Sequence, residues 1–430
     1  MAENGVNDVK QAASAASQSP ALRPLLVKFR PMSLPTLASP LCLLRNAEVH
    51  APQPLGLKNL LIGGGAILWM DDAGAPLPSG LPLDVLDLEG RRLIPGLIDG
   101  HVHVTGGGGE SGYASRVPAL PLSRYTLSGV TTVVGLLGTD DTLRGTRELV
   151  AGVMGLREEG LSAFGYCGGY HLPPATITGS VRGDLTLVDC LIGVGELAIS
   201  DHRSSQPTLD ELLRVAADAH VAGLMTGKAG IVHLHLGDGE RGLDLVRRAL
   251  AQSELPARVF NPTHVNRRKA LFEEAVALAR QGCWIDITAF PVEDGEDAWS
   301  AEDALERYLD AGAPAERVTI SSDAGGCLPC FDDEGRVCGM DVGTPGALPR
   351  ALAELLRRGR TLEQALPAFT LNPARLLRLP GKGRIAVGAD ADLAVLGDDD
   401  LPESVMARGV WHVRERIAVR RGSFETAPVR

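Results

Sequence analysis

The stretch LIDGHVHVTGGGGESGY (residues 97–113) joins an apolar β-like run to two histidines, four glycines and one glutamate. His101 and His103 flank a single valine. On a strand, residues two apart point to the same side, so both imidazoles would leave a buried strand together and could bind one cation. Two ordinary histidines near a turn would give the same pattern, so the rest of the chain has to decide between these interpretations.

Seven further β-like runs follow the first, and helical patterns separate most of them. The eight runs are 97–103, 131–137, 162–170, 191–199, 231–236, 258–265, 283–290 and 317–323. Helical patterns are clear at 209–225, 269–282 and 301–312, whereas the crossover 172–190 is the least helix-like. Strands that alternate with helices form parallel sheets. Eight such units over roughly 280 residues fit an α/β fold of the (β/α)8 TIM barrel type.

The segments on either side of the barrel are predicted to form one small β-sandwich domain. Short β segments fill 41–94, and β patterning returns after residue 380. We therefore predict a small domain from 41–94 plus 381–430 and a barrel over 95–380. Residues 1–40 are predicted to be a flexible extension, since the first 31 residues are rich in Ala, Ser and Gln and lack the apolar core of a secretory signal. Two alternatives for this segment are a true start of the protein at Met32 and an organellar transit peptide.

The composition limits the classes of partner. A formal net charge of −11 without a basic stripe argues against nucleic acid, and no apolar run approaches the ~18–20 residues of a membrane span. Seven cysteines in no regular framework suit a reducing compartment, so we expect a cytoplasmic protein, and also a homo-oligomer. Cys327 and Cys330, with Cys338 nearby, suggest a zinc or redox site only weakly, because no fourth ligand lies at finger-like spacing.

Metal-binding residue types collect at the predicted C-terminal ends of the strands, where barrels of this kind form active sites. They are His101, His103, Glu196, His235, His264 and Asp323, with Tyr170 closing the third strand. Core histidines placed at random would not collect at the ends of the strands. Imidazole and carboxylate ligands without thiolate suit Zn²⁺ and leave Mn²⁺, Fe²⁺, Co²⁺ and Ni²⁺ open. Because six ligands exceed what one tetrahedral zinc takes, we predict two divalent ions that share a carboxylate and a water.

Longer motifs resemble a known group of enzymes. PGLIDGHVH (95–103) and GRIAVGADADLAVL (383–396) are similar to motifs of the amidohydrolase superfamily. Within it, the chain is most similar to the isoaspartyl dipeptidase family, through VTTVVGLLGTD, GGYHLPPATITGSV, AISDHRS, HLGD and PTHVNR. The resemblance implies a metal-dependent hydrolase in which a metal-bridging hydroxide cleaves the β-aspartyl amide bond of a dipeptide.

The resemblance also implies a role for each matching residue. His101 and His103 would hold the more buried ion, and His235 and His264 the more exposed one. Asp323 would ligate the buried ion and act as general acid and base, while Tyr170 would polarise the scissile carbonyl.

The substrate-binding residues implied by the resemblance surround these ligands. Glu110 would bind the α-ammonium of the substrate, helped by Thr139, and Arg203 and Arg267 would bind its carboxylates with their bidentate guanidinium groups. Gly108 and Cys327 would complete the site. Glycines let a backbone approach a small ligand closely. The GGGG run would therefore bring the chain near the substrate next to Glu110. The alternative is that the run is a flexible linker.

Two positions depart from the family pattern. The family bridges its metals with a carboxylated lysine, but no lysine occurs from 183 to 200, and Glu196 takes its place after an extra residue, Gly195. An inserted glycine commonly makes a β-bulge that re-aims a side chain, so we predict that Glu196 turns inward to bridge the ions. A single-metal site that excludes Glu196 is the alternative. Cys327 replaces a serine that helps to bind the substrate carboxylate, and a thiol is a weaker donor.

Two other functions compete with the leading one. A hydrolase of cyclic amides or N-acyl amino acids would stay within the superfamily, but such substrates lack a free α-amino group to pair with Glu110. A non-catalytic scaffold is a third interpretation, and the retained ligand residues argue against it.

Overall fold

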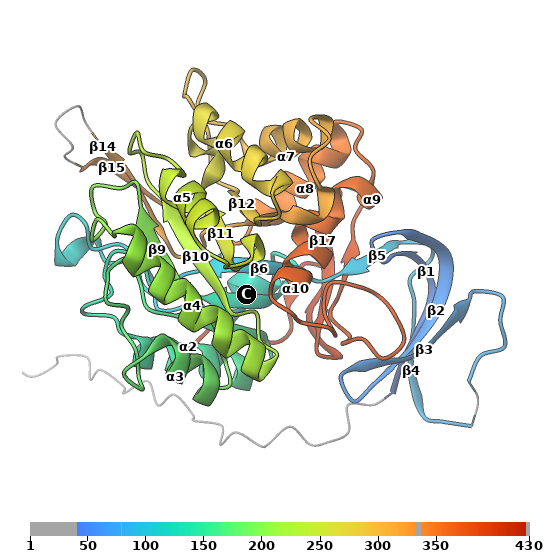
Figure 1. Ribbon diagram of the computed structural model, residues 1–430. Coiled ribbons are helices and arrows are strands. Elements are labelled where there is room, and N and C mark those ends of the chain that lie inside the picture. Colours follow the sequence, from blue (N-terminus) through green and yellow to red (C-terminus); the bar gives the residue numbers. More distant parts are fainter. Residues whose placement is uncertain (1–40, 79, 332–336, 427–430) are drawn as a thin grey trace, which may run out of the picture. The chain divides into compact units, whose positions relative to one another are not determined.

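The computed structural model describes residues 41–78, 80–331 and 337–426, without the side chains of 329–331 and 337–338 (Figure 1). The extension predicted for 1–40 therefore lies outside the described residues, as do the side chains of Cys330 and Cys338. All of the described residues belong to one compact unit. The predicted boundary between barrel and small domain remains a prediction.

Eight parallel strands form the barrel, in agreement with the predicted TIM-barrel fold. They are β6 (Leu97–Val102), β7 (Val130–Gly135), β8 (Ser162–Cys167), β9 (Leu191–Ile199), β10 (Ile231–Leu236), β11 (Phe260–Thr263), β12 (Ile285–Thr288) and β13 (Val318–Ser321). Strands β6 to β11 pair in chain order, and β12 pairs with β13. Trp284 N donates to Phe260 O at 3.3 Å and His103 N donates to Ala324 O at 2.8 Å, and these two bonds join the two sheets into a ring.

A buried carboxylate ties the first strand of the ring to the last. Asp99 on β6 accepts hydrogen bonds from the backbone N–H of Ser322, at 3.1 Å, and from its hydroxyl. Burial raises the pKa of Asp99 to about 7. Because Ser322 directly precedes Asp323, this contact places a predicted metal ligand beside the strand that carries His101 and His103, the HVH pair.

Helices follow most of the strands and pack against them. They are α1 (Leu122–Thr126), α2 (Thr146–Glu159), α3 (Val181–Leu187), α4 (Leu209–Thr226), α5 (Asp244–Gln252), α6 (Lys269–Arg280), α7 (Ala301–Asp310), α8 (Ala347–Arg357), α9 (Leu362–Ala365) and α10 (Leu371–Leu376). Helices α4, α6 and α7 match the three predicted helices, and α4 begins at a capping box formed by Thr208 and Glu211. The 172–190 crossover holds only the short α3.

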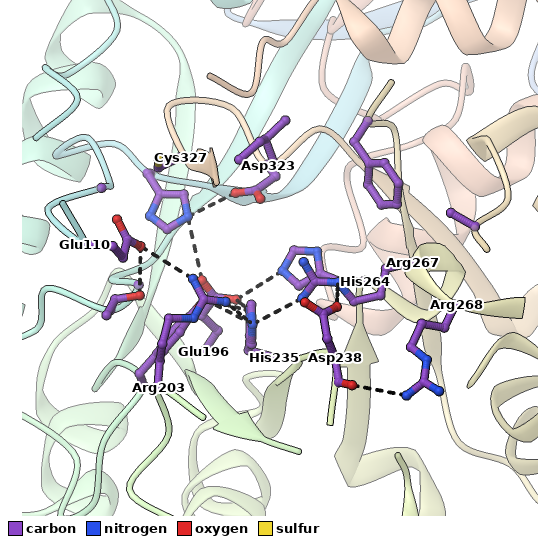
Figure 2. A pocket seen from close by; sticks show the side chains of 18 of the residues that line it. Glu110, Glu196, Arg203, His235, Asp238, His264, Arg267, Arg268, Asp323 and Cys327 are labelled. Carbon is purple, nitrogen blue, oxygen red and sulfur yellow. Dashed lines mark hydrogen bonds and ion pairs between the residues drawn. The ribbon is translucent and has the colours of Figure 1, made fainter. Parts of the chain in front are cut away.

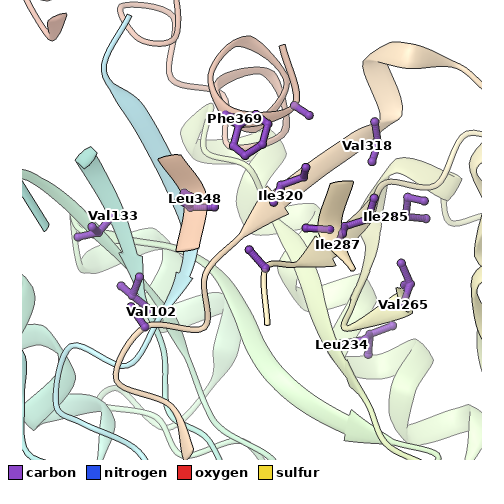
Figure 3. Packing of buried hydrophobic residues seen from close by; sticks show 14 of the residues in the cluster. Val102, Val133, Leu234, Val265, Ile285, Ile287, Val318, Ile320, Leu348 and Phe369 are labelled. Carbon is purple, nitrogen blue, oxygen red and sulfur yellow. The ribbon is translucent and has the colours of Figure 1, made fainter. Parts of the chain in front are cut away.

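The main hydrophobic core lies between the strands and the helices (Figure 3). Val102 and Leu234 belong to it, together with Ile285 on β12 and Leu348 on α8. Successive residues of a strand point to opposite faces. While Val102 packs into this core, its two histidine neighbours therefore face the barrel interior, and this alternation places the predicted ligands in the site.

A nine-stranded sheet joins the two ends of the described chain. Its strands are β1 (Leu41–His50), β2 (Pro54–Gly63), β3 (Ala66–Asp72), β4 (Leu83–Asp87), β5 (Arg92–Pro95), β16 (Leu393–Leu396), β17 (Pro402–Ala407), β18 (Val410–Arg414) and β19 (Ile417–Ala418). Antiparallel pairing of β5 with β16 joins the N-terminal strands to the C-terminal ones, as predicted. A hairpin of β14 (Cys327–Phe331) and β15 (Val337–Val342), which the sequence did not predict, follows the barrel strands. Within the described residues no helix is long and apolar enough to cross a membrane.

Candidate active site

Glu196 lies between two pairs of histidines. Its Oε1 is 3.6 Å from Nε2 of both His101 and His103. Its Oε2 is 3.1 Å from His235 Nδ1 and 3.4 Å from His264 Nε2. One carboxylate thus presents a different oxygen to each pair, which is the arrangement that a ligand shared by two ions requires. Whether Glu196 bridges two ions remains a prediction.

Asp323 adds a second carboxylate on the side of the HVH pair. Its Oδ1 lies 3.3 Å from His101 Nε2 and 3.0 Å from His103 Nε2. Two ligand atoms that each lie about 2.0–2.2 Å from a tetrahedral ion are themselves about 3.3 Å apart. The 3.3 Å separation between Asp323 and His101 matches this value, and the 3.0 Å separation from His103 is a few tenths of an ångström shorter.

The unpaired atoms of the cluster also fit a metal. Within the described residues, His101 Nε2 and Asp323 Oδ1 are buried without a hydrogen-bond partner, although a buried polar atom normally has one. Overlapping sets of three buried donors could each hold an ion: His101, His103 and Glu196; His101, His264 and Asp323; and Glu196, His235 and His264. The donor chemistry is therefore that of a divalent cation site.

The β-bulge predicted at Gly195 is present. Val232 pairs with Val194, but Leu234 pairs with Leu197, so β9 contains one residue more than β10 over this interval. Gly195 has φ +147°, in the range that side chains rarely adopt. The extra residue shifts the alternation of the strand, and Glu196 lies in the barrel interior with 1% of its surface exposed.

Two of the predicted ligands have backbone conformations that are uncommon for their residue types. His264 has φ +60° and Asp323 has φ +52°, and both directly follow or nearly follow a barrel strand. Left-handed conformations at non-glycine residues concentrate at functional sites, where the surrounding structure holds them. At these strand ends the turn directs both side chains toward Glu196 and the HVH pair.

Two further residues, which no sequence motif marked as ligands, orient the predicted ligands. His235 Nε2 lies 3.1 Å from Asp201 Oδ2, and His264 Nδ1 lies 2.7 Å from Thr288 Oγ1. A metal-binding histidine typically uses its second ring nitrogen in this way. Asp201 lies in the AISDHRS motif, one of the stretches that resemble the isoaspartyl dipeptidase family, so the sequence could have indicated its importance. Nothing in the sequence indicated a role for Thr288.

Charge in the cluster favours a bound cation. Burial disfavours the imidazolium form of His101, but the carboxylates of Glu196 and Asp323 outweigh this and raise its pKa to about 9. Burial likewise raises the pKa of Glu196, yet His101 and His235 hold it well below the usual range. Both carboxylates are therefore charged and attract positive charge to the space between the histidines.

Tyr170 presents a protonated hydroxyl to the same cluster. Its Oη lies 2.8 Å from His235 Nδ1. Burial, followed by the charge of Glu196, raises the pKa of Tyr170 well above its ordinary value. The phenol therefore remains a hydrogen-bond donor at neutral pH, as the implied role of polarising a carbonyl requires.

A cavity of about 540 Å³ opens over the cluster, and all six predicted substrate-binding residues line it (Figure 2). These are Gly108, Glu110, Thr139, Arg203, Arg267 and Cys327. The backbone at Gly108 has φ +72°, and a β-carbon there would lie 2.5 Å from Ser115 O. Glycine at position 108 therefore lets this part of the loop pack tightly against residue 115 beside the cavity, and its approach to a substrate remains a prediction.

Glu110 and Arg203 lie side by side in this cavity. Thr139 donates its hydroxyl hydrogen bond to Glu110 Oε1 at 3.0 Å, and Arg203 Nη1 lies 3.6 Å from the same oxygen. Glu110 Oε2 is buried with no hydrogen-bond partner among the described residues. Asp201 holds the guanidinium group of Arg203 through contacts of 3.1 and 2.7 Å. A carboxylate and a guanidinium group are thus held next to each other at one side of the predicted metal ligands.

Arg267 also reaches His235, since Arg267 Nη1 lies 3.5 Å and Arg203 Nη2 lies 3.3 Å from His235 Nε2 (Figure 2). Arg267 Nη1 donates to Leu236 O at 2.5 Å, and its Nε lies 3.3 Å from Asp238 Oδ1. Cys327 lines the cavity as well, and burial together with the charges of Glu110 and Asp323 raises the pKa of its thiol to about 11. Cys327 is therefore a neutral thiol at neutral pH.

Comparison with known proteins identifies the family of the chain. Residues 92–412 match the amidohydrolase family. The crystal structure of a beta-aspartyl dipeptidase from Fervidobacterium islandicum, in complex with a beta-Asp-Leu dipeptide, is 40% identical with a TM-score of 0.84, over 89% of this chain and 98% of that chain. A D-hydantoinase from a Thermus species, 15% identical with a TM-score of 0.61, shares the fold over 89% of this chain and 97% of that chain. An imidazolonepropionase from a Ruegeria species is 26% identical over 82% of this chain and 90% of the relative.

Proposed function

The chain belongs to the amidohydrolase family, and we propose that it is a metal-dependent peptidase that hydrolyses the β-aspartyl (isoaspartyl) amide bond of dipeptides. Hydrolase chemistry follows from the family and from the cluster of buried histidines and carboxylates. The dipeptide substrate is the finer step, and the similarity to a beta-aspartyl dipeptidase supports it.

The observation that carries the proposal is the adjacent pair of Glu110 and Arg203, 3.6 Å apart beside the metal ligands. In a β-aspartyl peptide the side-chain carboxyl forms the amide bond, so the α-ammonium and the α-carboxylate both stay free on one carbon. A neighbouring acid and guanidinium group match these two adjacent charges. An α-linked peptide, an N-acyl amino acid or a cyclic amide lacks at least one of the two charges.

Arg267 suits the other end of such a dipeptide. It lines the same cavity, with Nη1 3.5 Å from His235 Nε2, and guanidinium groups bind carboxylates in a bidentate manner. With the zwitterionic end at Glu110 and Arg203, and the terminal carboxylate at Arg267, the scissile amide would lie over the metal ligands.

The chain's own residues can carry the proton transfers. When bound by His101, His103, Glu196, His235, His264 and Asp323, two divalent ions, which we take to be Zn²⁺, would polarise the amide and activate water. Asp323 would accept a proton from the attacking water and return it to the leaving amine. The Tyr170 hydroxyl would donate a hydrogen bond to the carbonyl oxygen as negative charge develops there.

A second candidate is a hydrolase of cyclic amides. The named sequence relatives include imidazolonepropionases and allantoinases at 26–28% identity over most of the chain. These names favour a ring-opening reaction on the same metal ligands, but they offer no reason for the charged pair of Glu110 and Arg203.

A substrate panel separates the two. The Zn²⁺-loaded protein would be assayed with β-Asp-Leu, α-Asp-Leu, N-acetyl-β-Asp-Leu and dihydrouracil. We expect kcat/KM for β-Asp-Leu to exceed the other values by about 10–100-fold or more, because charged hydrogen bonds contribute roughly 1.5–3 kcal/mol each. Faster turnover of the cyclic amide would instead establish the second candidate.

A further inference from the structure

His233 is a buried histidine of the barrel that the predicted ligand set does not use. It stands on β10 two residues before His235, with 1% of its surface exposed. Because residues two apart share a face of a strand, His233 points into the barrel one layer below His235. The HLH sequence at 233–235 thus repeats the spacing of the HVH pair, but its first histidine lies under the cluster.

Two hydrogen bonds connect His233 to the cluster and to the barrel wall. His101 Nδ1 lies 2.9 Å from His233 Nε2, and His233 Nδ1 lies 2.7 Å from Asn261 Oδ1. An amide oxygen can only accept, so the proton of His233 is on Nδ1, and its Nε2 accepts from His101. In the neutral form of His101, which is the form that binds a metal, the proton is then on Nδ1 and the lone pair of Nε2 faces Glu196 and Asp323.

A metal ion between His101, His233 and Asp286 would be a different explanation, since these three offer donor atoms near one another. Two nitrogens that each lie about 2.0–2.1 Å from a tetrahedral ion are about 3.3 Å apart, whereas the observed separation of 2.9 Å is that of a hydrogen bond. The Asp286 oxygens already accept hydroxyl hydrogen bonds from Thr263 and Thr319, at 2.7 and 2.6 Å. The contact is therefore a hydrogen bond.

The position of His233 is fixed from two sides. The Tyr166 ring stacks on it, with 5.1 Å between centroids and 28° between planes. On β9, a β-carbon on Gly195 would lie 2.9 Å from His233 Cβ. The bulge that turns Glu196 inward thus packs directly on His233. His233 therefore contacts both His101 and the backbone next to Glu196.

We propose that His233 is a positioning residue that fixes the tautomer and ring orientation of His101, so that His101 Nε2 faces the metal. The proposal rests on the metal dependence proposed above and is independent of the substrate. Residues that orient a metal ligand typically change metal affinity by about 10–100-fold when they are replaced.

Zinc binding to the full-length protein tests this directly. The chelator-treated protein would be titrated with Zn²⁺ alone, by competition with a chromophoric chelator. In His233→Gln an amide oxygen can replace Nε2 as acceptor for His101, whereas His233→Leu removes the acceptor. We expect His233→Leu to weaken one zinc site by about 10–100-fold, and His233→Gln to stay closer to wild type than to His233→Leu.

Tyr166→Phe is the matched control, because it removes a buried hydroxyl that has no partner among the described residues and keeps the stacked ring. Zinc affinity should be unchanged in it. If His233→Leu does not fold, Asn261→Leu removes the far end of the chain of hydrogen bonds and should weaken the same site less strongly.

Equal zinc affinity in wild type and His233→Leu, or an equal loss in the Gln and Leu variants, would overturn the positioning role. A wild-type protein that binds zinc but leaves β-Asp-Leu intact would overturn only the proposed substrate. A wild-type protein that binds no divalent ion would overturn both.

Discussion

Gly195 packs so closely against His233 that a β-carbon on the glycine would lie 2.5 Å from the carbonyl oxygen of His233. No side chain fits in that space, and φ +147° is itself strained for any residue but glycine. The position of Glu196, the next residue, therefore depends on a glycine.

Gly195→Ala should accordingly disturb both the fold and the metal site. Strained backbone of this kind costs of order 1–3 kcal/mol, so we expect a lower midpoint of thermal unfolding and less zinc retained after dialysis. Gly155→Ala is a control on exposed α2, where nothing lies within 4 Å of the added β-carbon. That change should stabilise the protein by up to about 1 kcal/mol. A Gly195→Ala protein with normal stability and zinc content would contradict the role of the bulge.

Glu196 should make metal binding independent of carbon dioxide. A glutamate supplies its carboxylate directly, whereas a lysine must first be carboxylated. We expect the chelated protein to recover full zinc content and activity in bicarbonate-free buffer, and Glu196→Gln to lose zinc, since an amide is a weaker ligand. Glu196→Lys should stay inactive even with bicarbonate, because the bulge directs a side chain of glutamate length to the ions. Rescue of Glu196→Lys by bicarbonate would show that the longer arm fits and that the bulge is not decisive.

The sequence was sufficient to predict that the proposed ligands lie together, because the information for this is local. Alternation along β6 and the position of strand ends in a parallel barrel bring His101, His264 and Asp323 together without any knowledge of packing. The supporting contacts could not be predicted in this way. His101 and His233 are 132 residues apart in the chain, and their hydrogen bond depends on the depth of each residue in the barrel. The spacing of HLH was visible, but it did not reveal which histidine lies below the other.

Glu110 should discriminate between substrates with and without a free ammonium group. Glu110→Gln removes the charge but keeps a hydrogen-bonding oxygen for Thr139. We expect kcat/KM for β-Asp-Leu to fall by roughly 10–100-fold, since a charged hydrogen bond contributes about 1.5–3 kcal/mol. The already low rate with N-acetyl-β-Asp-Leu should change much less. Equal losses on the two substrates would mean that Glu110 only supports its loop.

His412 on β18 should make the protein less stable in mild acid. Its side chain is fully buried, both ring nitrogens are without a partner among the described residues, and burial, helped by Arg420, lowers its pKa to about 4. Between pH 6.5 and 4 the unfolded chain therefore binds a proton that the folded one does not, and stability falls as the pH falls through this range. The difference amounts to about 3 kcal/mol at 1.36 kcal/mol per pKa unit.

Unfolding midpoints of wild type and His412→Phe, measured from pH 7.5 to 4 with chelator present, check this expectation. The variant should lose less stability than wild type over the acid range, with the values at pH 7.5 as reference. Parallel curves would show that His412 is protonated in the folded protein or does not contribute.

Arg267 should matter only when the leaving residue carries a carboxylate. Arg267→Met keeps much of the apolar stem and removes the guanidinium group. Because the lost contact is to the terminal carboxylate, we expect kcat/KM for β-Asp-Leu to fall by about 10–100-fold. β-Asp-leucinamide, which lacks that carboxylate, should react slowly with wild type and at nearly the same rate with the variant. Steady-state rates for the two enzymes and two substrates give the coupling between guanidinium and carboxylate. A coupling near zero would contradict the assignment, and Arg267 would then serve to hold Leu236 O and Asp238 at the mouth of the cavity.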